Sequence, residues 1–158
     1  MTDDVFPDRN MEHLDKISWV IETNGWCAEP VAASADPPAP GYTYTIGFEP
    51  SYGASEVVIF GLQPVAARGL LELIHAQISN GLTIPDGIFV GLLDNDLRAA
   101  MLPLDLDEVA DLFPDATALL GADGYRMSQF VWPDRNGLLP WEDGYDERLR
   151  LAQPVLAA

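Results

Sequence analysis

The sequence is poor in the residues that most often perform catalysis or bind metals. Its 158 residues include one cysteine (Cys27), two histidines (His13 and His75) and one lysine (Lys16). A single cysteine excludes an intramolecular disulfide bond and any metal cluster built from several cysteines. With only two histidines, a histidine-based metal site would need both of them, or one together with carboxylates.

Common catalytic motifs are missing as well: there is no glycine-rich phosphate loop, G-x-S-x-G, H-E-x-x-H or C-x-x-C. Cys27 is expected to be a half-buried thiol, because a nucleophilic cysteine needs a nearby base and only two histidines are available. We expect His13 and His75 to be surface or boundary residues rather than ligands or general bases. The sequence therefore predicts no cofactor, no metal and no catalytic residue, and it favours a protein that is not an enzyme.

Positive charge is scarce. Lysine and arginine number 8 against 25 aspartates and glutamates, which gives a formal net charge of −17. Such a surface repels nucleic-acid phosphates and anionic lipids and attracts basic proteins. We expect no direct binding to nucleic acid or membrane. Two interpretations stay open: the charge serves solubility alone, or it attracts a basic partner.

Long apolar runs are missing too, and none approaches the roughly 20 residues that span a bilayer. The first residues, MTDDVFPDR, are acidic and do not form a signal peptide, so a cytoplasmic protein is expected. The length fits a single domain over residues 1–158, and a hydrophobic content of 48% is enough for a sizeable core.

Periodicity, turn residues and caps predict an α+β fold with one mixed, mostly antiparallel sheet of about five or six strands packed with three helices. The first helix is expected to be capped by Asn10 and ended by Gly25. The expected helices cover 11–24, 64–80 and a segment from Asp105 that Pro114 breaks or restarts. The expected strands are 26–32, 42–49, 56–62, 87–94, 97–104 and 125–132. Residues 34–41 are a proline-rich loop, and the chain beyond Pro133 is mostly irregular.

Carboxylates cluster at two places in the second half of the chain. Asp94 and Asp96 flank a predicted turn, while Asp105, Asp107 and Glu108 begin a helix with the spacing of a capping box. Their spacing does not match a calcium-binding loop. Caps and turns are therefore the expected role of these residues.

The stretch YTYTIGFE is rich in aromatic and β-branched residues. Alternation places Tyr42 and Tyr44 on one face of its strand and Thr43 and Thr45 on the other. Gly47 indicates a bulge or a close approach of two backbones. Strand packing explains these residues, and a pocket lined by Tyr44, Thr45 and Gly47 is the functional alternative.

The stretch QFVWPDRNGLLPWEDG has the composition of a strand end followed by a tight turn. Asp134 is expected to accept backbone hydrogen bonds and Arg135 to pair with a carboxylate. Trp141 is expected to fold back onto the sheet. The stretch is thus interpreted first as a structural clasp with Trp132 and Trp141 buried, then as a binding hot spot, and third as a site of catalysis by Asp134.

Several segments resemble the bacterial family catalogued as domain of unknown function DUF4262. The resemblance is carried by GW (25–26), YTIGF (44–48), EVVIFGL (56–62), QFVWPDRNGLLPWEDG (129–144) and QP (153–154). It implies a small, single-domain bacterial protein and no particular reaction. Ser55 stands where this family usually has proline, and 82–125 matches less well than the rest.

Two functions remain as hypotheses. The first is a non-catalytic, immunity-like or regulatory module that binds a basic protein; a DNA-mimic inhibitor is a less favoured variant, because no helix shows a long acidic stripe. The second is a small-ligand-binding protein or enzyme with a pocket around the YTIGF and VWPDR segments. The candidate binding residues are Tyr44, Thr45, Gly47, Glu56, Gln129, Trp132, Asp134, Arg135 and Trp141.

Overall fold

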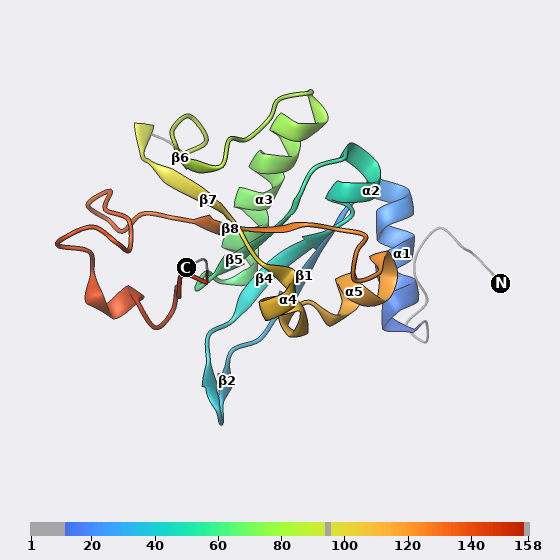
Figure 1. Ribbon diagram of the computed structural model, residues 1–158, viewed down its shortest axis with the longest axis horizontal. Helices are drawn as coiled ribbons and strands as arrows, with labels where there is room; N and C mark the ends of the chain where they lie inside the picture. Colours follow the sequence, from blue (N-terminus) through green and yellow to red (C-terminus); the bar gives the residue numbers. More distant parts are fainter. Residues whose placement is uncertain (1–11, 94–95, 157–158) are drawn as a thin grey trace.

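The computed structural model describes residues 12–93 and 96–156. At its centre is a mixed sheet in the order β1-β4-β5-β8-β7-β6, in which only the β5 and β8 neighbours are parallel (Figure 1). The predicted α+β class with one mixed, mostly antiparallel sheet is confirmed. In sheet order the strands are β1 (Cys27–Val31), β4 (Tyr42–Ile46), β5 (Glu56–Phe60), β8 (Met127–Val131), β7 (Ala99–Pro103) and β6 (Gly87–Phe89).

The first helix passes into the first strand through a glycine. Helix α1 (His13–Asn24) ends at Gly25, whose φ of 89° is the left-handed conformation expected of a helix-ending glycine. The predicted cap, Asn10, lies outside the described residues, and Glu12 occupies the N-cap position without a side-chain bond. After β1 the proline-rich segment forms a small hairpin, β2 (Ser34–Ala35) with β3 (Pro38–Ala39).

The strand predicted over 42–49 is shorter than expected. It ends at Ile46 because Gly47 turns the chain with a φ of 128°, and the short helix α2 (Phe48–Tyr52), which was not predicted, follows. Tyr42 and Tyr44 share one face of β4, as predicted, with ring centroids 6.2 Å apart.

One face of the sheet is covered by α3 (Pro64–Ser79), which begins with a proline in its first turn. Leu71 and Ile74 of this helix are completely buried against the sheet, where they join Val57 and Ile59 of β5. The alternate residues of β5 face the opposite side, so this strand is buried on both faces, which agrees with its nearly continuous apolar sequence.

The opposite face is covered by α1 and by a broken helical segment. The segment comprises α4 (Leu106–Val109), the 3-10 turn η2 (Ala110–Leu112) and α5 (Pro114–Leu120). Its last part, α5, lies beside α1 in Figure 1. Asp105 caps α4 by accepting a bond from the Asp107 N–H, and Pro114 restarts the helix, as predicted. These breaks, together with α2, give more helices than the three expected.

The strands on the far side of the sheet, β6 and β7, are shorter than predicted, and the predicted turn at Asp94 and Asn95 lies outside the described residues. After β8 the chain is irregular apart from the 3-10 turn η3 (Glu147–Leu149). This last segment returns to the sheet, where Leu156 packs on the α1 and α5 side.

Candidate functional site

Glu56 carries the most buried carboxyl group among the predicted candidates. Its side chain is fully buried and accepts hydrogen bonds from the Thr45 hydroxyl and from the backbone N–H groups of Gly47, Phe48 and Glu49, at 2.7–3.0 Å. Burial raises the pKa of Glu56 to about 7, although these bonds act in the opposite direction. The carboxyl group thus fixes the turn from β4 into α2, and none of its bonds points to an outside ligand.

Gly47 brings two predicted family motifs into backbone contact. A Cβ atom at this position would lie 2.6 Å from the Gly25 carbonyl oxygen and 2.7 Å from the Trp26 Cα. The same Gly25 oxygen accepts a bond of 2.6 Å from the Ser51 hydroxyl. The close approach that Gly47 indicated in the sequence is therefore a packing contact between the GW and IGF segments.

Gln129 and Trp132 attach the last residues of the chain to the sheet. The Gln129 amide donates to the Pro154 carbonyl (2.6 Å) and accepts from the Leu156 N–H (2.9 Å). Gln153 reciprocates by accepting from the Trp132 N–H (2.9 Å) and donating to the Trp132 carbonyl (3.0 Å). The amide side chains of the QF and QP segments are thus bonded to backbone, and they hold the C-terminal segment beside β8.

Asp134 behaves as the predicted turn residue. Its carboxylate accepts backbone bonds from Asn136, Leu138 and Asp146 at 2.9–3.0 Å. Burial alone would raise the pKa of Asp134, but these N–H groups lower it below its ordinary value. Arg135 is exposed and forms no ion pair within the described residues, contrary to the pairing expected for it. Neither residue is arranged for proton transfer.

Trp141 does not fold back onto the sheet, and the prediction of a buried Trp141 is wrong. Its side chain is 47% exposed, because the loop that carries it is closed by its own bonds, including Leu139 N–H to the Glu142 carboxylate at 2.9 Å. Trp132, in contrast, is partly buried and donates from its indole N–H to the Phe60 carbonyl at 2.8 Å. Trp141 lines an open groove of about 610 Å³ formed by Leu102, Pro140, Trp141, Arg150, Gln153, Pro154 and Val155.

These contacts join the GW, YTIGF, EVVIFGL, WPDR and QP segments into one set of packed turns. A family model of a domain of unknown function, DUF4262, matches residues 20–146. The chain belongs to the DUF4262 family. No curated protein and no solved structure matches it.

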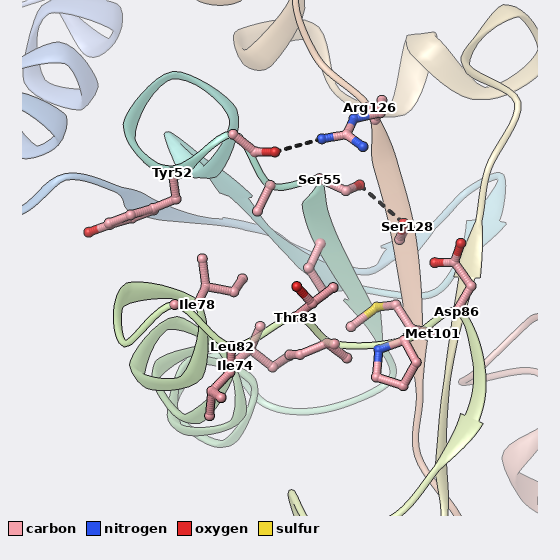
Figure 2. A pocket seen from close by; sticks show the side chains of 16 residues that line it. Tyr52, Ser55, Ile74, Ile78, Leu82, Thr83, Asp86, Met101, Arg126 and Ser128 are labelled. Atoms are coloured by element: carbon pink, nitrogen blue, oxygen red, sulfur yellow. Dashed lines mark hydrogen bonds between the residues drawn. The ribbon is translucent and has the colours of Figure 1, made fainter.

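The DUF4262 chain also contains a cavity of about 420 Å³ at the end of the sheet where the central strands β5 and β8 begin (Figure 2). Its floor is apolar and includes Met101 and Ile74, while Ser55 and Ser128 at the rim lie 3.1 Å apart between their hydroxyl oxygens. Arg126 at the rim is already bound by the Glu49 carboxylate, with Nε to Oε2 at 2.6 Å. A small, largely apolar molecule with a hydroxyl or amide group fits this chemistry better than an anion does. None of the nine predicted candidates lines the cavity.

Charge is distributed unevenly over the described surface. Five arginines each pair with a carboxylate on α2, on α3 or in the C-terminal loops: Arg68, Arg98, Arg126, Arg148 and Arg150. The segment 105–123 instead carries six carboxylates and neither lysine nor arginine. We call its members the α4–α5 carboxylates: Asp105, Asp107, Glu108, Asp111, Asp115 and Asp123. Within the described chain only Asp115 of this set takes part in an ion pair, with His13.

Sequence reasoning missed the surface features. Asp105, Asp107 and Glu108 were interpreted as the cap of a helix, although the run from 105 to 123 without a basic residue was visible in the sequence. His13 was assigned to the surface, which is correct for its exposure but omits its carboxylate neighbours from β1 and α5. None of the helices in the described chain is long and apolar enough to cross a membrane.

Proposed function

We propose that this DUF4262 protein is a non-catalytic binding module for a basic protein, with an immunity-like or regulatory role. The observation that carries the proposal is the division of the molecule into two kinds of polar group. Buried polar side chains of the motifs are bonded to backbone, whereas the α4–α5 carboxylates other than Asp115 are exposed. Among the described residues, only Asp115 of this set has a cationic partner, His13. Complementary charge accelerates association with a basic surface and makes it sensitive to salt.

The groove beside Trp141 supplies the apolar part of the proposed contact. Trp141 is the most exposed of the four tryptophans, and aromatic side chains dominate the binding energy of interfaces. Leu102, which lines the groove, precedes Asp105 by three residues, so the groove and the first α4–α5 carboxylate lie within about 10 Å along the chain. The fitting partner therefore presents an apolar side chain flanked by lysine or arginine.

The proposal places the protein in the bacterial cytoplasm, where many basic proteins are available as partners. It also predicts no direct contact with nucleic acid, because the carboxylate surface and the phosphates repel each other. A partner with an apolar side chain but no flanking basic groups would contact only the groove. It would therefore bind weakly and without dependence on salt.

The test begins with capture of partners from the native host's lysate at low and raised salt. The purified partner is then titrated against the wild type and two variants. Trp141→Ala is expected to weaken binding about thirtyfold, the size of a hot-spot loss of about 2 kcal/mol. The triple variant Asp107→Asn/Glu108→Gln/Asp111→Asn is expected to weaken it and to reduce its salt dependence.

Matched controls separate the proposed surface from general effects. Val65→Ala removes an exposed apolar side chain on α3, across the sheet, and Asp36→Asn/Glu72→Gln/Asp86→Asn removes three negative charges elsewhere. Both controls should bind the partner as the wild type does. Affinity that ignores ionic strength, or that survives both surface variants, would overturn the proposal.

The cavity of Figure 2 supports a second candidate function, the binding of a small molecule. A thermal-shift screen of small amphipathic compounds tests it. A ligand that raises the Tm of the wild type should have no effect on Ile78→Phe, which fills the cavity, and should still stabilise Val65→Phe, which points to solvent on the same helix.

A further inference from the structure

Three metal-ligating side chains from distant parts of the chain meet on the α1 and α5 side of the sheet. His13 begins α1, Glu29 lies in the middle of β1, and Asp115 lies in the first turn of α5. The His13 Nε2 atom is 2.7 Å from the Glu29 Oε2 and 3.1 Å from the Asp115 Oδ2. In the described part of the chain this is the one group of three or more such residues with all ligand atoms within 4.8 Å. We call it the His13 triad.

The donor set of the His13 triad is that of a first-row transition metal. Imidazole nitrogen and carboxylate oxygen bind Zn²⁺ at about 2.0–2.2 Å, whereas Mg²⁺ and Ca²⁺ prefer oxygen alone. Tetrahedral ligands at that distance lie roughly 3.3–3.5 Å from one another. The separation of 2.7 Å between His13 and Glu29 must widen by about 0.6–0.8 Å to reach this value, and that of 3.1 Å between His13 and Asp115 by about 0.2–0.4 Å, which side-chain rotations provide.

The enclosure of the triad is also suitable. The Glu29 and Asp115 side chains are 12% and 24% exposed, so both carboxylates are mostly shielded from water, while His13, at 62%, leaves an entry path from solvent. Two shielded carboxylates close together repel each other, and a bound cation relieves that repulsion. Three protein ligands leave a fourth position for water, the arrangement typical of an accessible zinc site.

A second, independent observation points into the same place. Tyr44 is completely buried, and its hydroxyl is the buried side-chain polar atom of the described residues that has no hydrogen-bond partner. Tyr44 lies directly opposite Glu29 in the β1–β4 register. Burial and the negative charges of Asp115 and Glu29 raise the pKa of Tyr44, while the Asp115 backbone N–H acts in the opposite direction.

An unpartnered buried hydroxyl costs about 1–3 kcal/mol, so its presence calls for a reason. Phenylalanine would fill the same aromatic packing against Phe113, whose ring centroid is 5.1 Å away, without that cost. A hydroxyl at this position has a use if it donates a hydrogen bond to a water molecule or to a reoriented carboxylate when a cation is bound. Metal ligands are usually held by such outer hydrogen bonds.

We propose that His13, Glu29 and Asp115 bind a zinc-class divalent transition-metal ion, with water as fourth ligand and the Tyr44 hydroxyl bonded to that water or to a ligand carboxylate. The ion joins α1, β1 and α5, the three elements that carry its ligands. The metal site can be tested separately from the proposed partner binding. Asp115 is the one residue shared by the His13 triad and the α4–α5 carboxylates, and the triple variant described above does not change it.

The experiment titrates metal-free, full-length protein with Zn²⁺ by calorimetry, and with Co²⁺ by absorption spectroscopy. One ion per chain is expected, with the visible absorption bands of tetrahedral Co²⁺ and a raised Tm. His13→Gln should abolish binding, and Tyr44→Phe should weaken it about tenfold, the size typical of lost outer hydrogen bonds. Mg²⁺ at the same concentration should neither compete nor raise the Tm.

Matched variants test whether the second histidine or the cysteine binds the ion instead. His75→Gln removes the second imidazole, and Cys27→Ser removes the thiol, which lies two residues before Glu29; both should bind Zn²⁺ as the wild type does. Far-UV circular dichroism of each metal-free variant establishes that it is folded. The proposal is overturned if the wild type takes up neither ion at millimolar concentration, or if folded His13→Gln binds as tightly as the wild type.

Discussion

The buried carboxyl group of Glu56 predicts an unusual dependence of stability on pH. Its pKa is raised from 4.5 to about 7 on folding, so between these values the folded protein holds a proton that the unfolded chain has lost. The stability that this group contributes is fully present below pH 4.5 and is lost as the pH rises through 7. The difference amounts to about 3 kcal/mol, because a tenfold change in proton affinity corresponds to about 1.4 kcal/mol.

Glu56→Gln isolates this contribution because the amide cannot titrate. Thr45 is the one donor around Glu56 that can also accept, so the amide NH₂ should turn towards its hydroxyl oxygen. That orientation leaves the Phe48 N–H without its acceptor, because the same carboxylate oxygen serves both groups. The loss of one buried acceptor costs about 1–3 kcal/mol. We therefore expect the variant to be destabilised by that amount near pH 5, and the difference from the wild type to shrink towards pH 8.

The assay is urea unfolding of both proteins at pH 5, 6, 7 and 8, followed by circular dichroism and tryptophan fluorescence. Taking the difference between the two proteins cancels the titration of every other group. Glu108→Gln removes an exposed carboxyl group from α4 and should stay within about 0.5 kcal/mol of the wild type throughout. A difference that stays constant or grows between pH 5 and 8 would refute the reasoning, because it would mean that the four donors outweigh burial and keep Glu56 ionised.

Two further predictions concern the packed turns. Gly47→Ala should lower the free energy of unfolding by about 3 kcal/mol or prevent folding, because the new Cβ would lie 2.6 Å from the Gly25 oxygen in a backbone with φ 128°. Gly69→Ala, in the open middle of α3, should instead raise the free energy of unfolding by about 0.5–1 kcal/mol. Urea titrations of the two variants test this difference. Gln153→Ala should lower the free energy of unfolding by about 2–4 kcal/mol and alter tryptophan emission, since it leaves the backbone N–H and carbonyl of Trp132 unpaired. The control is Gln63→Ala, which replaces an exposed glutamine. Unchanged stability of Gln153→Ala relative to this control would show that the C-terminal segment is not held by these bonds.

The sequence was sufficient for the sheet and its long helices because their signals are local. The apolar run of β5, Gly25 after α1 and Pro64 at the start of α3 each mark an element by residues within a few positions. Helix α2 was missed because its first N–H groups are bonded by Glu56, which follows the helix by several residues in the next strand. A partner at that separation leaves no periodic pattern.

The candidate site shows the same contrast. Asp134 was correctly predicted as a turn residue from the composition of its neighbours, whereas Trp141 was predicted to be buried from its hydrophobicity alone. Which way a loop tryptophan points depends on how the loop closes, and here the Glu142 carboxylate closes it from within. The His13 triad joins residues separated by 16 and 102 positions, so only the packing of α1 and α5 on β1 brings them together.

The hydrogen bonds of the motifs limit where any activity of this chain can reside. A carboxyl group that already accepts three or four backbone or hydroxyl bonds, as those of Asp134 and Glu56 do, cannot bind a ligand without breaking them. Gln153 is committed in the same way to the backbone of Trp132. Within the family segments, Glu56, Asp134 and Gln153 therefore hold the fold, and substitutions there test stability. The binding that we propose depends instead on groups that the fold leaves unsatisfied or exposed: the Tyr44 hydroxyl beside the His13 triad, the Trp141 groove and the α4–α5 carboxylates.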